Sequence, residues 1–315
     1  MNESGHIAIL DHFRKWAAEQ PDGIAVRYGD DTLTFRKLDQ ISDKVADDLI
    51  GTDPSRPFIG LSATKNLSAI IGLLAIIKSG RAYLPLEPSY PAARIRQMLS
   101  DSGVETVICG PDEDQYFTSA GLRIVTATSD RDEHANIQSL SLNAAPELIA
   151  LLYTSGSTGF PKGVCVTHDG VHNLIEHQLQ HTTARPGSQN LLFSQLTFDA
   201  SLHEIGLSLA SGGTLHIIDD SIRLDSVRLL KYIDEWSINR ISVPYVTLQY
   251  LTKTAQAAGR YLPSLNEIIT GGELLKITPP IRDFFRERPD CTLVNVYGPT
   301  ETSILVTTLR LQGDA

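Results

Sequence analysis

Short apolar segments alternate with segments of helical periodicity along most of the chain, and this order limits the fold more than any other feature. In the first half, a strand is expected at residues 58–61, a helix at 67–78 that ends near Gly80, and a strand at 82–86 beside prolines. The second half repeats the alternation from residue 148 onward. Because strands separated by helices pair in parallel through crossovers, the sequence predicts layered α/β subdomains.

A polar stretch at residues 127–136 is the best candidate for a boundary between two such subdomains. We therefore expect a first α/β subdomain at residues 1–135 and a second at residues 136–315. In the second subdomain, strands are expected at 148–153, 164–166, 213–218, 240–243, 267–270 and 292–296, and helices at 201–209, 226–236, 246–258 and 279–286.

Composition excludes several classes of protein. The 315 residues carry a net charge of −10, which argues against nonspecific binding to nucleic acid. The sequence has no apolar run of about 18 residues, so no membrane span is expected, and its first residues do not resemble a signal peptide. Three widely spaced cysteines indicate reduced thiols in a cytoplasmic protein.

The most informative motif is the run YTSGSTGFPKG at residues 153–163, which lies between two apolar segments. Glycines let a backbone approach an anion, hydroxyl groups donate to phosphate oxygens, and Lys162 adds positive charge. The run is not a Walker loop, because its lysine stands between Pro161 and Gly163 and a strand follows. Taken alone, it is equally compatible with a solvated surface turn.

This run resembles the phosphate-loop signature of the adenylate-forming superfamily, which includes acyl-CoA synthetases, luciferases and the adenylation domains of nonribosomal peptide synthetases. Four further stretches match in the expected order, at residues 33–38, 78–86, 198–201 and 295–301. The resemblance covers nearly the whole chain. It implies the fold of the superfamily's N-terminal domain in truncated form, with the stretches at 33–38 and 78–86 serving mainly in packing.

The resemblance also implies an ATP site. Asn295 and Tyr297 would contact adenine, Thr300 would contact the α-phosphate, and Glu301 would hold Mg²⁺. Catalytic roles would fall to Thr154, Lys162, Thr300 and Glu301. The full nucleotide-binding set would be Thr154, Ser155, Gly156, Ser157, Thr158, Gly159, Lys162, Gly271, Gly272, Glu273, Asn295, Val296, Tyr297, Gly298, Thr300 and Glu301. An ordinary Gly-Pro turn is the alternative interpretation of residues 295–301.

Asp199 decides the substrate class under this resemblance. In peptide-synthetase adenylation domains, the Asp of Phe-Asp-x-Ser holds the substrate's α-ammonium group, and a partly buried carboxylate needs such a partner. The alternative is that Asp199 only caps the helix that begins near Ser201. The amino-acid pocket would consist of Asp199, Ala200, His203, Ser242, Ile269, Gly271, Val296, Ile304 and Leu305. Apart from Asp199, the polar side chains of this pocket are those of His203 and Ser242. His203 is also compatible with an ordinary core or surface histidine.

Four histidines at i, i+4 spacing raise a second possibility, a zinc site. They are His168, His172, His177 and His181. A zinc protease places Glu after the first histidine, whereas this chain has Asp169 there, Gly170 weakens the helix, and no third ligand is evident. We therefore expect no zinc chemistry at this segment.

The implied reaction is amino-acid activation: a carboxylate attacks the α-phosphate of ATP, giving aminoacyl-AMP and pyrophosphate for nonribosomal peptide synthesis. Complete family members add a C-terminal subdomain with a catalytic lysine and a carrier protein that bears phosphopantetheine. We expect this chain to be an incomplete N-terminal portion with little adenylation activity alone. A fragment of an acyl- or aryl-CoA ligase and a noncatalytic binding or assembly partner remain as alternatives.

Overall fold

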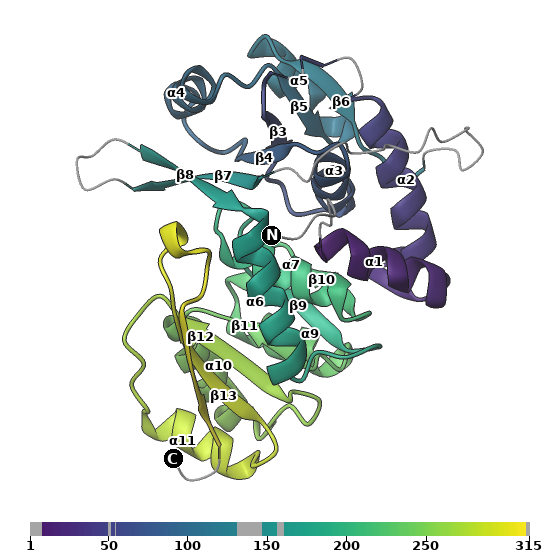
Figure 1. The fold of residues 1–315 in the computed structure, drawn as a ribbon. Helices are drawn as coiled ribbons and strands as arrows, with labels where there is room; N and C mark the ends of the chain where they lie inside the picture. The colour runs from purple at the N-terminus through teal and green to yellow at the C-terminus, as the bar shows by residue number, and fades with distance from the viewer. Residues whose placement is uncertain (1–7, 50–51, 54, 131–146, 156–160, 313–315) are drawn as a thin grey trace.

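Two twisted sheets organise the molecule, with helices between them and on their outer faces (Figure 1). The computed structural model describes residues 8–49, 52–53, 55–130, 147–155 and 161–312. Gly156, Ser157, Thr158 and Gly159 of the expected phosphate loop lie outside the described residues. The layered α/β fold class predicted from the sequence is confirmed.

The larger sheet has eight strands, six of them parallel with an antiparallel strand at each edge. Its order is β14 (Thr307–Leu311), β13 (Thr292–Tyr297), β12 (Glu267–Gly271), β11 (Arg240–Ser242), β9 (Gln189–Leu192), β10 (Thr214–Ile217), β1 (Ile24–Tyr28) and β2 (Asp31–Thr34). The carboxyl ends of its parallel strands therefore meet at one edge, where ligands of open α/β sheets bind.

The smaller sheet has six strands and ends in a long antiparallel hairpin. Its order is β6 (Arg123–Thr126), β5 (Thr106–Cys109), β3 (Phe58–Ser62), β4 (Ala82–Leu86), β7 (Leu148–Ser155) and β8 (Pro161–Thr167). All neighbouring pairs other than β7 with β8 are parallel. The hairpin of β7 and β8 projects beyond the rest of this sheet in Figure 1.

Three apolar clusters hold the helices on the sheets. The largest cluster lies between the sheets and contains side chains from α1 (Ala8–Glu19), α2 (Phe35–Asp47), α3 (Leu67–Lys78), α6 (His168–His181) and α7 (Ala200–Ala210). A second cluster packs α9 (Ser226–Glu235), α10 (Tyr245–Ala258) and α11 (Pro279–Glu287) on the larger sheet. A third packs α4 (Ala92–Ser102) and α5 (Asp114–Ser119) on the smaller sheet. The remaining short elements are η1 (Pro111–Glu113), α8 (Asp220–Arg223) and η2 (Thr300–Thr302).

Helix α3 shows how the sequence fixes one of these elements. Asn66 caps its start by accepting a hydrogen bond from the Ala69 amide, and the next eleven residues are buried with the exception of Ser68. At its other end Lys78 is fully buried and contacts Asp39 and Asp43 of α2, with Nζ to Oδ1 distances of 2.6 and 2.7 Å. The stretch at residues 78–86 thus ties α3 to α2, as expected of a packing motif.

The two sheets exchange strands across the boundary expected near residue 135. Strands β1 and β2 come from the first 34 residues but belong to the larger sheet, whereas β7 and β8 belong to the smaller one. Residues 131–146, which contain much of the expected boundary, lie outside the described residues. Among the described helices, none is both long and apolar enough to cross a membrane.

Candidate active site

The β7–β8 hairpin carries the flanks of the expected phosphate loop. Thr154 pairs with Lys162, and Ser155 pairs with Pro161, so the loop residues that are not described connect two strands in register. Lys162 is exposed, and its Nζ lies 4.0 Å from Oε1 of Glu301. Strand β8 contacts η2. The structure therefore brings the lysine of the phosphate-loop run to the acidic residue of the stretch at 295–301.

Strand β13 carries that stretch to the carboxyl edge of the larger sheet. Asn295, Val296 and Tyr297 are the last three residues of the strand, and the Tyr297 side chain is exposed. The chain then turns so tightly that a Cβ on Gly298 would collide with the Ile304 carbonyl oxygen. Ile304 itself is buried at φ +79°, a backbone conformation that a β-branched residue rarely adopts. This turn places η2, with Thr300 and Glu301, beside the hairpin.

Asp199 occupies the N-cap position of α7, but its side chain makes no capping hydrogen bond. The capping alternative is therefore not supported at this residue. Burial raises the pKa of Asp199, while a hydrogen bond from the Thr300 side chain opposes the rise. The negative charge of Glu301 adds to the increase. Within the described part of the chain no ion pair to Asp199 is found, and this half-buried carboxylate faces the residue expected to meet the α-phosphate.

A cavity of about 420 Å³ opens beside Asp199. All nine residues of the expected amino-acid pocket line it: Asp199, Ala200, His203, Ser242, Ile269, Gly271, Val296, Ile304 and Leu305. Gly272, Glu273 and Gly298 of the expected nucleotide set also line it. A Cβ on Gly271 would come within 2.6 Å of the Val296 side chain, so the close approach of β12 and β13 at this wall requires glycine.

Other expected nucleotide residues lie outside this cavity. Thr154, Lys162, Asn295, Tyr297, Thr300 and Glu301 do not line it. Of these, Thr300 and Glu301 act electrostatically on Asp199, and Lys162 contacts Glu301, so they surround the cavity on the side of the hairpin. The expected site residues did not include seven residues that line the cavity, namely Phe193, Ser194, Gln195, Phe198, Arg223, Val243 and Pro244.

A buried charged network behind the cavity was also missed. Arg240 Nε donates to Glu267 Oε2 at 2.8 Å, and Arg310 Nη1 donates to Glu267 Oε1 at 2.9 Å. Arg240 Nη2 lies 3.1 Å from Nε2 of His203. Burial, and then the charge of Arg240, hold the pKa of His203 well below its usual value. The available signal was an arginine and a glutamate at the first positions of two short strands.

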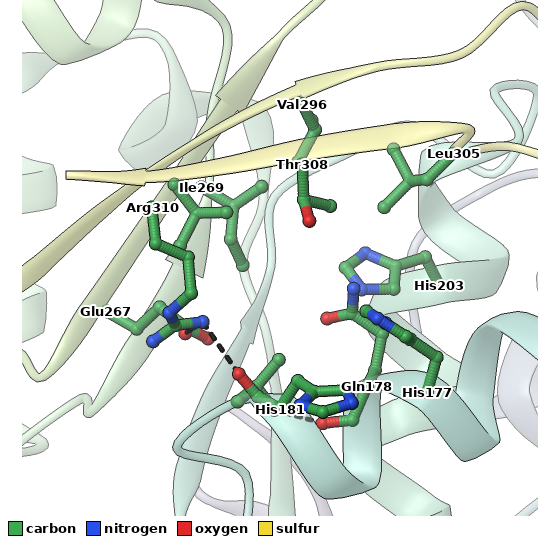
Figure 2. Close-up of a pocket in the computed structure, with 12 residues that line it drawn as sticks. His177, Gln178, His181, His203, Glu267, Ile269, Val296, Leu305, Thr308 and Arg310 are labelled. Atoms are coloured by element: carbon green, nitrogen blue, oxygen red, sulfur yellow. Dashed lines mark hydrogen bonds and ion pairs between the residues drawn. The ribbon is translucent and has the colours of Figure 1, made fainter.

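A second, smaller recess lies on the other side of His203, between α6, the larger sheet and the loop before β14 (Figure 2). Its volume of about 20 Å³ is enough for roughly one water molecule. His177 and His181 of the histidine-rich helix line it. Among the described residues, no group of three or more His, Cys, Asp and Glu side chains is arranged to hold a metal ion.

Glu301 suits Mg²⁺ as a single protein ligand. Its carboxylate is about half exposed beside Lys162, where phosphate oxygens would complete the coordination. Mg²⁺ in nucleotide enzymes is commonly held by one or two carboxylates together with substrate phosphates. The donor set therefore fits a metal that arrives with the nucleotide, and it does not fit a metal held by the protein alone.

A largely parallel sheet with a cavity beyond the carboxyl ends of its strands defines a ligand-binding α/β protein of the open-sheet class. The sequence profile of the AMP-binding enzymes matches residues 13–315, and the chain belongs to that family.

Two curated relatives are peptide synthases. The chain is 32% identical over 309 residues to tyrocidine synthase 2 of Brevibacillus parabrevis, covering 96% of the chain and 8% of that protein. It is 33% identical over 311 residues to bacitracin synthase 1 of Bacillus licheniformis, covering 95% of the chain and 6% of that protein. The chain thus spans under a tenth of either relative.

A solved structure shares the fold. The nonribosomal peptide synthetase FmoA3 bound to α-methyl-L-serine-AMP superposes with a TM-score of 0.87 at 24% identity, covering 98% of this chain and 34% of that chain. Its form bound to AMPPNP gives a TM-score of 0.86 over 33% of that chain. At this level of identity the likeness establishes the fold alone.

Proposed function

We propose that this chain forms the ATP- and amino-acid-binding part of an enzyme that activates an amino acid as aminoacyl-AMP for nonribosomal peptide synthesis. The observation that carries the proposal is the position of Asp199. Its half-buried carboxylate lines the cavity, makes no helix cap, and is influenced by Thr300 and Glu301. The likeness to tyrocidine synthase 2 and bacitracin synthase 1 supports the same proposal.

The substrate ammonium group would bind Asp199. Burial disfavours the charged form of this carboxylate. A cation beside it stabilises the charged form and so lowers the pKa that burial has raised. The carboxylate of the same amino acid would then point toward Thr300, because that side chain also contacts Asp199. The amino-acid carboxylate and the α-phosphate would thus be held close together, which supplies much of the rate enhancement in such a displacement.

ATP would bind across the hairpin and the carboxyl end of β13. Tyr297 offers an exposed ring for stacking, Asn295 an amide for the adenine edge, and Lys162 a positive charge for phosphate. Mg²⁺ at Glu301 would neutralise charge that develops on the phosphate oxygens. The role of this chain's own residues is to align the carboxylate with the α-phosphate and to stabilise the developing charge with donors from Thr154, Lys162 and Thr300.

Three finer assignments belong to the proposal. A C-terminal adenylation subdomain would add the catalytic lysine, and a carrier protein with phosphopantetheine would accept the aminoacyl group. The reaction would take place in the cytoplasm. The division into subdomains at residues 1–135 and 136–315 would leave the amino-acid cavity in the second part, since all of its lining residues lie there.

Calorimetry with paired ligands tests the function directly. The chain is titrated with nonhydrolysable aminoacyl-AMP analogues (aminoacyl sulfamoyl adenosines) and with the same compounds lacking the α-amino group. The proposal predicts that removing the amino group weakens binding by about tenfold or more, because Asp199 then loses its only cationic partner. Equal affinities would favour an acyl- or aryl-CoA ligase, and no binding by either series would favour a noncatalytic partner.

A further inference from the structure

The wall of the cavity at His203 and the charged network behind it lie on one face of the larger sheet. Arg240 and Ser242 are two residues apart on β11, so their side chains share a face. Arg240 is the register partner of Glu267, and Ser242 is the register partner of Ile269. The buried charged side chains and the side chains of the cavity wall therefore form neighbouring rows on one face of the sheet. Helix α7 covers this face with His203.

Only one assignment of donor and acceptor is possible for the contact between Arg240 and His203. A guanidinium group donates hydrogen bonds and accepts none, so Nε2 of His203 must be the acceptor at 3.1 Å. A histidine that accepts at Nε2 is neutral and carries its proton on Nδ1. The ring is therefore a hydrogen-bond donor at Nδ1.

Arg240 is itself held in place by charge. Its side chain is 3% exposed and pairs with Glu267, which is fully buried and also receives Arg310. Arg310 in turn donates to the His181 carbonyl at 2.8 Å, and Figure 2 shows this contact at the edge of the recess. The charge of Arg240 also acts on the buried carboxyl group of Glu204, so the charged groups around His203 are of both signs. The N–H donor that Arg240 imposes on the ring, and not a net charge, would favour an oxygen acceptor over a cationic ligand side chain.

The Nδ1–H donor of His203 is available to a ligand. The residue lines both the main cavity and the small recess, and within the described residues no hydrogen bond to its Nδ1 is found. Figure 2 shows the ring directed toward the small recess, which Leu305 and Thr308 also face. In the main cavity the nearby walls at Ile269, Val296 and Leu305 are apolar, so this N–H and the Ser242 hydroxyl are the polar features at this end.

We propose that Arg240 and Glu267 hold His203 as a donor at Nδ1, and that the amino acid bound here carries an acceptor oxygen in its side chain. This rests on the proposed function, because it names the substrate class of the same site. His203 is the residue that touches the substrate. Arg240 and Glu267 are positioning residues, which act on the substrate only through the histidine.

Matched ligand pairs test the substrate class. The chain is titrated by calorimetry with aminoacyl sulfamoyl adenosines that carry asparagine or leucine, and glutamine or norleucine, since the members of each pair are similar in size. In at least one pair, the oxygen-bearing member is expected to bind about tenfold or more tightly, because an apolar side chain leaves a buried donor unpaired. A lysine analogue is expected to bind more weakly than norleucine.

Variants locate the origin of this preference. His203→Leu should bring the two members of the preferred pair to within about twofold of each other. Arg240→Met with Glu267→Gln removes both charges and should reduce the preference, since the ring is then free to change its tautomer. His216→Gln serves as a control, because His216 is a buried histidine that does not line the cavity.

A spectroscopic measurement keeps the test independent of how well the variants fold. ¹⁵N-resolved NMR of the unmodified chain near pH 7 should show His203 neutral with its proton on Nδ1. A proton on Nε2, or a doubly protonated ring, would overturn the inference. Binding of every analogue without preference for acceptor oxygens would also overturn it while leaving amino-acid activation intact, whereas binding of no analogue would overturn the proposed function itself.

Discussion

Lys162 and Glu301 join the two sheets at an ion pair whose Nζ and Oε1 atoms lie 4.0 Å apart. The two side chains are 66% and 49% exposed, so the pair contributes little to folding. Its importance is positional, because the lysine comes from the hairpin of the smaller sheet and the glutamate from the turn after β13. A phosphate group placed between the two sheets would meet a cation and the proposed Mg²⁺ ligand together.

Replacing Lys162 by Ala should therefore separate binding from stability. The free energy of unfolding is expected to change by less than about 0.5 kcal/mol, since the side chain is exposed. The affinity for a nonhydrolysable ATP analogue should fall by about tenfold through loss of a charged donor to phosphate. Urea unfolding and calorimetry measure the two quantities. Unchanged nucleotide affinity would place the phosphates elsewhere.

Replacing Lys78, in contrast, should reduce the stability of the fold. Its ammonium group is fully buried between Asp39 and Asp43, so Lys78→Met leaves two partly buried carboxylates without their cation. We expect a loss of roughly 3 kcal/mol of unfolding free energy in urea. Arg36→Met is the matched control, because Arg36 pairs with Asp22 at an exposed site and should cost little. Equal losses in the two variants would contradict this packing role.

Gly170 offers a test in which the usual sign of a substitution reverses. Glycine to alanine within a helix normally stabilises by about 1 kcal/mol. Here the new Cβ would approach Cβ of Ser303 to 2.6 Å, so Gly170→Ala should destabilise the protein, by about 1 to 3 kcal/mol. Thermal unfolding of Gly170→Ala with Ser303→Gly checks the cause, since removing the serine side chain should restore stability. A stabilised single variant would show that η2 does not pack on α6 in this way.

His216 predicts part of the pH dependence of folding. Burial, together with the charge of Arg27, lowers its pKa to about 4. An unfolded histidine titrates near pH 6.5, so between these values the unfolded chain binds more protons and stability falls as the pH falls. The stabilisation is fully present above about pH 6.5 and is lost toward pH 4, amounting to roughly 3 kcal/mol.

Comparison with His216→Gln isolates this contribution. Urea unfolding of both proteins between pH 4 and 7.5 should show a steeper loss of stability in the unmodified chain. The variant loses the contacts of the ring with Tyr232 and Gln189, so only the slopes and not the absolute stabilities are compared. Parallel curves would mean that His216 is not buried in its neutral form.

The elements of this fold follow from local patterns, whereas the order of the strands does not. Helix α3 is predictable because a cap, an apolar run and a C-terminal glycine follow one another in the continuous segment from Asn66 to Gly80. The pairing of β1 with β10 joins Val26 to Leu215, and no short-range pattern encodes such a contact. For the same reason, the boundary expected near residue 135 did not anticipate that the two sheets exchange strands.

The candidate site also contains residues that could be predicted from the sequence and residues that could not. The nine pocket residues were assigned by resemblance to the family, and all nine line one cavity. The Arg240–Glu267–Arg310 network was not predictable, since its members come from three strands that only the sheet order brings together. The hydrogen bond between Thr300 and Asp199 likewise joins two positions that are far apart in the sequence.

A double-mutant cycle between Asp199 and the substrate's amino group tests the central claim most directly. Affinities of the chain and of Asp199→Asn are measured by calorimetry for an aminoacyl sulfamoyl adenosine and for its counterpart without the amino group. The account predicts strong coupling: the amino group should improve binding by about tenfold or more in the unmodified chain and by less than about twofold in the variant. Additive effects would show that Asp199 does not hold the ammonium group, and would contradict amino-acid activation at this site.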